Sequence, residues 1–423
     1  MITLQIQNFK CFKKVEVPIN QLTVLAGGNG NGKSSVIQAL LLLRRTLEKK
    51  EKNIELNGVY CLNLGNSANL TSESEVIFIL KENNKKIEVS YNIDKVRATF
   101  SIVPNILEDT YQDNSLSFRE FYYLNAERIG PRISQPLNTL IFPNTGFQGE
   151  YTAQVIKELD NKGTTFKVDD ARILNDENYN FGALFVRRVN AWLAYILDGI
   201  TVEAYIDKDT HTSRLEVENA FSKGNPTSPT NTGFGISYVL PIIVTCLLAE
   251  KDRFVIIENP EAHLHPAPQS KIGHFLAKMA SAGLRIVVET HSDHIINGIQ
   301  LAVAEKEIES NSITINYFDK GEQQPEVHPI SMNDKKEIES SHITINHFDK
   351  GEQQPEVHPI SMNDKKEIES SHITINHFDK GEQQPEVHSI SMNEKGELDK
   401  WPKGFFDQTE IDFAKLIKLR RNV

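Results

Sequence analysis

A glycine-rich loop between two apolar segments constrains this chain more than any other feature. Residues 27–34 read GGNGNGKS and match the phosphate-binding pattern G-x-x-x-x-G-K-[ST]. The apolar run at residues 22–26 predicts a buried strand before the loop, and residues 35–40 predict the start of a helix after it. In that context the pattern predicts a nucleoside triphosphate site. The alternative is a glycine-rich turn with a chance lysine.

The residue types of this loop suit phosphate chemistry. Glycines let backbone N–H groups turn toward phosphate oxygens, and the helix start adds the positive end of its dipole. We expect Lys33 to reach the β- and γ-phosphates and the Ser34 hydroxyl to ligate Mg²⁺. The predicted nucleotide-binding residues are Gly27, Gly28, Asn29, Gly30, Asn31, Gly32, Lys33, Ser34 and Ser35.

Length and composition favour an ordinary cytoplasmic protein. The 423 residues, 39% of them apolar, allow about two to three domains with a substantial core. The longest membrane-like stretch, residues 236–249, is too short to span a bilayer, so we expect no membrane partner. No signal peptide is visible, and three widely spaced cysteines predict neither a disulfide framework nor a zinc site.

Three copies of one 30-residue unit follow one another at residues 306–335, 336–365 and 366–395. Each copy carries three lysines and six acidic residues, so the copies account for most of the net charge of −11. The rest of the chain is nearly neutral, which leaves room for a local basic surface that binds DNA or RNA.

Each copy predicts a β-hairpin. In the second copy, residues 343–348 and 356–360 read as strands and residues 349–352 as the turn between them. The copies form either tandem hairpins that lengthen one projection or partly disordered linkers. Their histidines could bind a metal, although solvated strand positions explain them more simply.

A second set of polar residues follows two more buried strands. The apolar run at residues 253–257 ends at Glu258, which we expect to hold Mg²⁺ beside the phosphate loop. The run at residues 284–288 delivers Glu289 and His291 to the same edge of the sheet, where ligands of open α/β sheets bind. A histidine there can contact a γ-phosphate.

A zinc site at His263, His265 and His291 is an alternative use of these histidines. Histidines two residues apart also serve as polar groups that fix a turn, and no cysteine stands near them in the sequence. The magnesium–nucleotide interpretation is the simpler one.

These motifs resemble the ABC-type ATPase heads of the SMC, RecF and OLD group. The resemblance is strongest to single-chain bacterial ATPases of anti-phage defence operons, such as the PtuA subunit of Septu. Residues 6–12 resemble their first-strand motif, residues 258–266 their Walker B and D-loop, and residues 289–292 their switch-histidine motif. Residues 125–132 also recur in such proteins. The match covers both ends of the ATPase fold and one motif between them.

The resemblance implies that ATP and Mg²⁺ are the cofactors and that two chains form a homodimer around ATP. In such heads the signature loop of one copy closes over the ATP of the other. Residues 232–237 resemble a divergent signature motif, and Gly235 and Ser237 are the candidates for contact with the partner's γ-phosphate. A glycine-rich loop that merely starts a core helix is the alternative.

One residue departs from the family pattern. Asn259 stands where the glutamate that activates water is usual, and an asparagine cannot accept a proton. General-base catalysis must then come from Glu261, from Glu289, or not at all. The candidate catalytic residues are Glu258, Glu261, Glu289 and His291, and we expect slow hydrolysis or a nucleotide-held switch.

The expected fold is an α/β ABC-type ATPase head, with a mostly parallel sheet, an antiparallel meander and C-terminal hairpin repeats. The strands of the meander are predicted at residues 76–80, 87–91 and 98–102. A helix is predicted over residues 187–197, and Arg128 and Arg132 could contact phosphate, a partner subunit or surface acids. The predicted divisions are residues 1–50 (Walker A lobe), 51–229 (inserted meander and helical subdomain), 230–305 (second ATPase lobe), 306–395 (repeats) and 396–423 (tail).

Three functions remain compatible with these residues. The first is a dimeric sensor or regulator in an anti-phage defence complex that controls a separate nuclease subunit, since no nuclease motif is visible in this chain. The second is a RecF- or SMC-like repair ATPase that acts on DNA directly. The third is an ATP-held scaffold that does not hydrolyse ATP.

Overall fold

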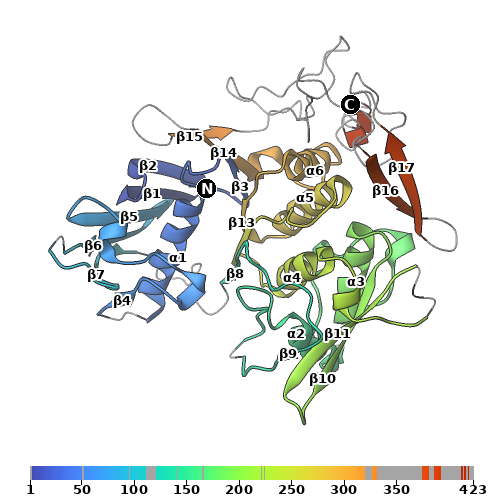
Figure 1. The fold of residues 1–423 in the computed structure, drawn as a ribbon. Helices are drawn as coiled ribbons and strands as arrows, with labels where there is room; N and C mark the ends of the chain where they lie inside the picture. The colour runs from blue at the N-terminus through green and yellow to red at the C-terminus, as the bar shows by residue number, and fades with distance from the viewer. Residues whose placement is uncertain are drawn as a thin grey trace, which may run out of the picture.

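The structure is a computed structural model. It describes residues 2–49, 52–94, 96–110, 121–140, 142–163, 166–220, 222, 224–319, 326–330, 374–380 and 385–391, together with residues 411, 412, 414, 415 and 418. The expected α/β class is confirmed, since helices occur between the strands along the chain, and the strands form parallel and antiparallel sheets (Figure 1). No helix among these residues is long and apolar enough to cross a bilayer.

A mostly parallel sheet forms the centre of the fold, in the order β15-β14-β3-β13-β12-β8. Only the β14–β15 pair is antiparallel. Because the strands that precede the predicted motifs run parallel, their carboxyl ends meet at one edge of the sheet. The strands are β3 (Leu22–Gly27), β8 (Tyr122–Leu124), β12 (Phe254–Glu258), β13 (Arg285–Glu289), β14 (Ile313–Asp319) and β15 (Glu326–Ile330).

Both faces of this sheet are buried, which explains the unbroken apolar runs of its strands. In β3, Leu22 and Val24 join one hydrophobic core and Leu25 joins the other. The first core contains α4 (Gly235–Leu248), α5 (Pro266–Ser281) and α6 (Asp293–Ala304), and the second contains α1 (Lys33–Lys49). The loops at the carboxyl edge are therefore held between two packed layers.

The second core is closed by an antiparallel sheet in the order β2-β1-β5-β6-β7-β4. The predicted meander is present, but its third strand begins at Ser101 and not at residue 98. The carbonyls of Thr99 and Phe100 instead accept backbone N–H groups of Ser67 and Leu56. The strands are β1 (Ile2–Phe9), β2 (Phe12–Ile19), β4 (Ile54–Glu55), β5 (Glu75–Glu82), β6 (Lys85–Asn92) and β7 (Ser101–Asp109).

The inserted segment packs onto the ATPase helices. Its α3 (Phe185–Ile196) agrees with the predicted helix, and Trp192 of α3 meets Phe275 of α5 edge to face, with ring centroids 4.9 Å apart. Residues 152–217 of this segment share the first core, whereas its meander belongs to the second core. The segment also contains α2 (Thr152–Asn161), β9 (Gln135–Pro136), β10 (Thr201–Asp207) and β11 (Thr212–Glu218).

Two of the three sequence copies contain described strands. The first copy supplies β14 and β15, and β14 pairs directly with the Walker A strand β3. The third copy forms the hairpin of β16 (Thr374–Lys380) and β17 (Pro385–Ser391). The second copy lies outside the described residues, so the tandem arrangement of hairpins stays a prediction.

A charged cluster joins α5, the end of α6 and the tail. His274 Nε2 lies 3.0 Å from Glu305 Oε2 and 3.2 Å from Glu307 Oε2, and Lys415 of the tail pairs with Glu305. Burial alone would lower the pKa of His274, but the two carboxylates raise it to about 9. A histidine with a raised folded-state pKa stabilises the fold below its unfolded pKa and loses that contribution as pH rises through the folded value.

The replacement His274→Gln is therefore expected to flatten the pH dependence of stability between pH 6.5 and 9. Over that window the parent chain should lose roughly 2–3 kcal/mol of unfolding free energy relative to the variant. Denaturant unfolding at both pH values measures the difference. The exposed His211, replaced by asparagine, is the matched control, and parallel profiles for parent and His274→Gln would refute this role.

Candidate functional site

The phosphate loop depends on glycine where β3 ends. Gly27 has φ +123°, and a Cβ atom there would lie 2.3 Å from the carbonyl oxygen of Phe318 on β14. Gly30 and Gly32 also have positive φ, at +79° and +99°. These conformations turn the loop back toward α1, which begins at Lys33. The backbone thus forms the turn that the sequence pattern predicts.

Lys33 lies inside this loop. Its side chain is 3% exposed, and Nζ donates hydrogen bonds to the carbonyls of Gly27 at 2.9 Å and Gly28 at 2.8 Å. Burial lowers the pKa of Lys33, while Glu289 and Glu261 act in the opposite direction. An ammonium group held by exchangeable carbonyl contacts at a helix start is placed to accept phosphate oxygens.

Two carboxylates stand side by side at the carboxyl edge of the sheet. Glu258 ends β12 and Glu289 ends β13, and they are partners in the strand register. Ser34 Oγ donates to Glu289 Oε1 at 3.2 Å, whereas Glu258 Oε1 accepts the Tyr123 hydroxyl at 2.9 Å. The structure therefore brings the predicted Mg²⁺ ligand Ser34 to Glu289 and places Glu258 on the next strand.

Burial controls the protonation of both acids. Burial, followed by the charge of Glu289, raises the pKa of Glu258 to about 7. Burial also raises the pKa of Glu289, although Lys33 and Ser34 act in the opposite direction. A bound divalent cation would relieve this repulsion, and carboxylate and hydroxyl oxygens are the ligands that Mg²⁺ prefers. The residues present at this edge of the sheet thus fit a magnesium ion bound together with a nucleoside triphosphate.

Asn259 has a backbone reason to be asparagine. Its φ is +44°, a left-handed conformation that asparagine tolerates better than glutamate. Its N–H donates to the carbonyl of Glu289 at 2.9 Å, and its carbonyl accepts a hydrogen bond from Arg128. The side chain that replaces the usual glutamate thus belongs to a tightly held turn.

The buried side chain of Arg128 stabilises that turn through hydrogen bonds. It is 2% exposed, and its guanidinium donates to the carbonyl of Glu258 at 2.7 Å. It also lies 5.2 Å from the ring centroid of Tyr238 on α4, and burial lowers its pKa to about 10. Arg128 is thus a buried arginine whose guanidinium binds backbone carbonyls of the Walker B turn and lies against α4.

Glu261 supports the switch-histidine turn. Its carboxylate accepts the Thr290 hydroxyl at 2.8 Å and the backbone N–H of His291 at 2.8 Å. Both oxygens are thus engaged by the segment that follows β13. Of the two alternative general bases, Glu289 is the one that contacts the phosphate-loop residue Ser34.

The signature-like segment packs on the turn after β12. Gly235 begins α4, and the rings of Phe234 and Tyr238 lie 5.2 Å and 4.5 Å from His263. A Cβ atom at Gly235 would lie 3.2 Å from Leu264. The side chain of His263 therefore packs against two aromatic rings at the start of α4. Among the residues with described positions, no three His, Cys, Asp or Glu side chains form a group that could hold a metal ion.

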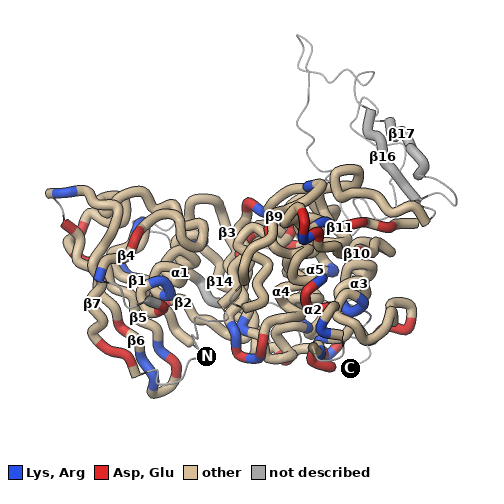
Figure 2. Tube along the Cα trace, turned by 90° about the horizontal axis from the view of Figure 1, so that it is seen from below, with Lys and Arg blue, Asp and Glu red and all other residues tan. Residues whose placement is uncertain are grey.

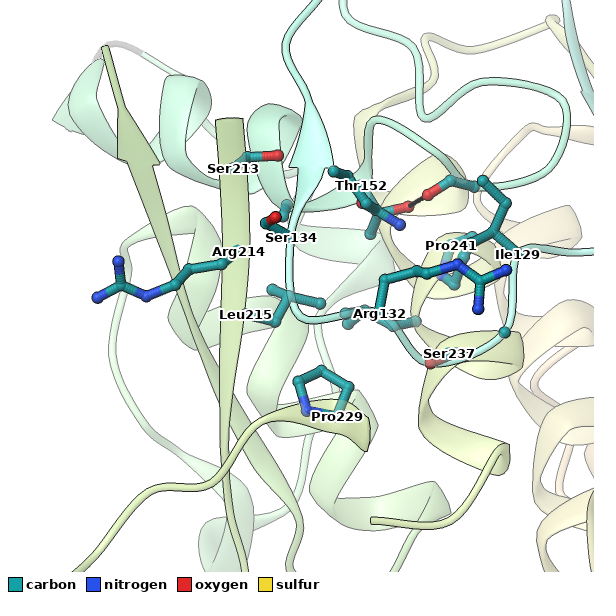
Figure 3. A pocket seen from close by; sticks show the side chains of 15 residues that line it. Ile129, Arg132, Ser134, Thr152, Ser213, Arg214, Leu215, Pro229, Ser237 and Pro241 are labelled. Carbon is teal, nitrogen blue, oxygen red and sulfur yellow. Dashed lines mark hydrogen bonds between the residues drawn. The ribbon is translucent and has the colours of Figure 1, made fainter. Parts of the chain in front are cut away.

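A pocket opens beside the start of α4 (Figure 3). Ser237 and Pro241 of α4 line it together with Ile129 and Arg132 of the 125–132 motif, and Ser213 of β11 lines another wall. Arg132 is exposed and donates to the carbonyl of Pro131 at 3.2 Å. The site thus places an exposed guanidinium next to the proposed trans-acting serine.

The sequence did not predict three contacts of this site: the hydrogen bond of Tyr123, the hydrogen bonds of Arg128 to backbone carbonyls, and the contact of β14 with the phosphate loop. Tyr123 lies within an apolar run that gives no hint of its hydrogen bond to Glu258. Asn31 Nδ2 donates to the carbonyl of Phe318 at 3.2 Å, so the first repeat contacts the phosphate loop. Only the apolar strand pattern at residues 313–318 could have suggested this.

Charged residues of both signs are spread along the described part of the chain. In the view of Figure 2, Lys and Arg residues are interspersed with Asp and Glu along the tube.

A scan of protein families gives two matches. Residues 22–297, more than half of the chain, match a family described as "AAA domain, putative AbiEii toxin, Type IV TA system" (AAA_21). Residues 368–416 match a family described as "Protein of unknown function (DUF3696)". No curated protein matches the chain.

Similar solved structures are heads of SMC proteins. A SmcHead bound to the C-winged helix domain of ScpA is 14% identical, with TM-score 0.48, and covers 78% of this chain and 97% of that chain. The SMC head domain from Thermotoga maritima is 11% identical, with TM-score 0.38 and coverage of 77% and 97%. The Smc head with an extended coiled coil bound to the C-terminal domain of ScpA, derived from Pyrococcus furiosus, is 12% identical, with TM-score 0.43 and coverage of 78% and 97%.

Proposed function

This chain belongs to the AAA_21 family of AAA domains. On that premise we propose that it is a P-loop ATPase of the ABC and SMC type, and that it hydrolyses ATP slowly at the site between β3, β12 and β13. Residues 27–35 hold the phosphates, with Lys33 on the β- and γ-phosphates. Ser34 and Glu258 hold Mg²⁺, which neutralises phosphate charge when it is bound. His291 contacts the γ-phosphate.

The observation that carries this proposal is the convergence of Lys33, Ser34 and Glu289 at one edge of the sheet. Ser34 lies 3.2 Å from Glu289, and the charge of Glu289 acts on Lys33. Two separate motifs, the phosphate loop and the end of β13, thus supply a cation, a hydroxyl and a carboxylate to one place. That donor set fits phosphoryl transfer.

Glu289 is the general base in this proposal. Asn259 cannot accept a proton, and the carboxylate of Glu261 is already occupied by Thr290 and His291. Burial raises the pKa of Glu289 toward the range in which a carboxylate takes a proton effectively. A base on the strand beside Walker B is not the usual arrangement, which agrees with slow turnover.

We further propose that two chains close around ATP, with Gly235 and Ser237 of one chain on the γ-phosphate of the other. The exposed start of α4 supports this proposal, since Phe234 is 52% exposed and no side chain caps the first N–H groups of the helix. Arg132 stands in the same pocket and adds positive charge toward a partner's phosphate.

In the cell we propose a dimeric sensor or regulator of an anti-phage defence complex that controls a separate nuclease subunit. The family description, which names a putative toxin of a toxin–antitoxin system, supports a role in such systems. A repair ATPase that acts on DNA directly, and a scaffold held by ATP without turnover, are the alternatives. The cytoplasmic location stays a prediction.

ATP-dependent dimerisation tests this proposal. Light scattering is expected to give the mass of one chain without nucleotide and of two chains with MgATP. Ser237→Arg should block the dimer by placing a large cation in the closing interface, while Ser72→Arg, on an exposed turn, should not. A single-chain mass at every MgATP concentration would contradict the dimer. Co-purification of a nuclease from the native host favours the defence role, and salt-dependent DNA binding by the chain alone favours repair.

A further inference from the structure

The strand beside the phosphate loop belongs to a repeated sequence. β14 is part of the first 30-residue copy, and it pairs in parallel with β3, so that Phe318 lies opposite Gly27. The third copy forms the hairpin β16–β17 elsewhere in the structure. In the first hairpin Ile315 pairs with Ile330, and in the third the corresponding Ile375 pairs with Ile390. One hairpin in one register thus occurs twice.

Every buried residue of β14 recurs in the third copy. The buried side chains of β14 are Ile313, Thr314, Ile315, Asn316 and Phe318. The third copy has the same residue types, in the same order, at Ile373, Thr374, Ile375, Asn376 and Phe378. The one difference within this stretch is His377 in place of Tyr317, which is only partly buried. The core therefore does not distinguish the two strands.

The polar contacts of β14 do not distinguish them either. Asn20 Nδ2 donates to the backbone carbonyl of Asn311 at 2.7 Å, which any residue can offer. Asn31 likewise binds the backbone carbonyl of Phe318. The side chain of Asn316 also takes part, since its Nδ2 donates to the carbonyl of Pro18 at 3.0 Å, and the third copy keeps this asparagine as Asn376.

The C-terminal tail contacts α5 and the residue that precedes the first copy, and these contacts do not involve either copy. Lys415 pairs with Glu305, the residue just before the first copy, and Asp412 accepts a hydrogen bond from Ser270 at 2.7 Å. The DUF3696 match over residues 368–416 covers the third hairpin and this tail together. The AAA_21 match ends at residue 297, before the first copy. The matched stretches thus join the third copy, not the first, to the tail.

We propose that the position beside β3 binds β16 in place of β14, so that the chain exchanges one copy for another at the edge of the phosphate loop. Residues 306–365 then form a loop, and Lys366 takes the position that Lys306 now has after α6. The cost of closing a longer loop grows only slowly with its length, so neither arrangement excludes the other. The exchange places His377, instead of Tyr317, opposite Ala26.

Phenylalanine replacements at equivalent positions test the exchange. Phe318 is fully buried. If no other copy can take its place, replacing the phenylalanine of the strand that pairs with β3 by alanine should lower Tm by roughly 10 °C. Phe318→Ala in the full chain should lower Tm far less, because the third copy replaces the damaged strand. The triple variant Phe318→Ala, Phe348→Ala, Phe378→Ala should show the full loss.

A shortened chain that lacks residues 306–365 completes the test. It is expected to fold and to bind MgATP like the full chain, and Phe378→Ala in this background should cost the full Tm shift. The proposal is overturned if Phe318→Ala alone lowers Tm as much as the triple variant does. Failure of the shortened chain to fold, or its indifference to Phe378→Ala, overturns it as well. None of these outcomes depends on hydrolysis of ATP.

Discussion

Replacing Lys33 by alanine is expected to weaken MgATP binding and turnover on the order of 100-fold. Its ammonium group is buried in the phosphate loop, where Nζ contacts the carbonyls of Gly27 and Gly28. Phosphate oxygens replace those carbonyls as partners when nucleotide binds, so the variant leaves phosphate charge without a counter-ion in a partly desolvated site.

Calorimetric titration with MgATP measures the loss in Lys33→Ala directly. The exposed Lys81, at the end of β5, is the matched control, and Lys81→Ala should bind like the parent chain. Unchanged thermal stability shows that the variant still folds. MgATP affinity equal to that of the parent chain would show that nucleotide binds elsewhere.

Glu289→Gln is expected to lower ATP turnover on the order of 100-fold or more while MgATP binding is largely retained. Glutamine keeps an oxygen for the hydrogen bond from Ser34 but cannot take a proton from water. Loss of hydrolysis without loss of binding separates the role of a base from that of a ligand.

Glu261→Gln is the matched control for Glu289→Gln. Glu261 binds Thr290 and the backbone of His291, so its replacement should disturb the switch-histidine turn and reduce turnover less than tenfold. Phosphate release at saturating MgATP compares the two variants. Brisk turnover that Lys33→Ala abolishes but that survives both glutamate replacements would refute Glu289 and Glu261 as bases.

The sequence predicted the parts of this fold that local patterns encode. Unbroken apolar runs identified β3, β12 and β13, and parallel strands then required Ser34, Glu258 and Glu289 to meet at one edge. The mixed α/β architecture followed from the same runs. Local patterns also placed the antiparallel meander, although non-local hydrogen bonds to Thr99 and Phe100 shifted its third strand.

Contacts between distant segments could not be predicted in this way. Two hydrogen bonds of the site join residues that are more than a hundred positions apart. One runs from Tyr123 to Glu258, and the other from Arg128 to the backbone carbonyl of Glu258. The near-identity of the repeats suggested a separate projection, whereas the first copy lies in the central sheet. Asn259 read as lost catalysis, and its positive φ adds a conformational reason for asparagine.

Phosphate release by the purified chain, measured at saturating MgATP over a range of protein concentrations, tests the central claim most directly. A slow ATPase whose site is completed by a second chain should turn over at less than about 1 s⁻¹, and only with Mg²⁺. Its rate per chain should rise with protein concentration as dimers form. Turnover that is independent of Mg²⁺, or no binding and no turnover of ATP at any protein concentration, would contradict this account.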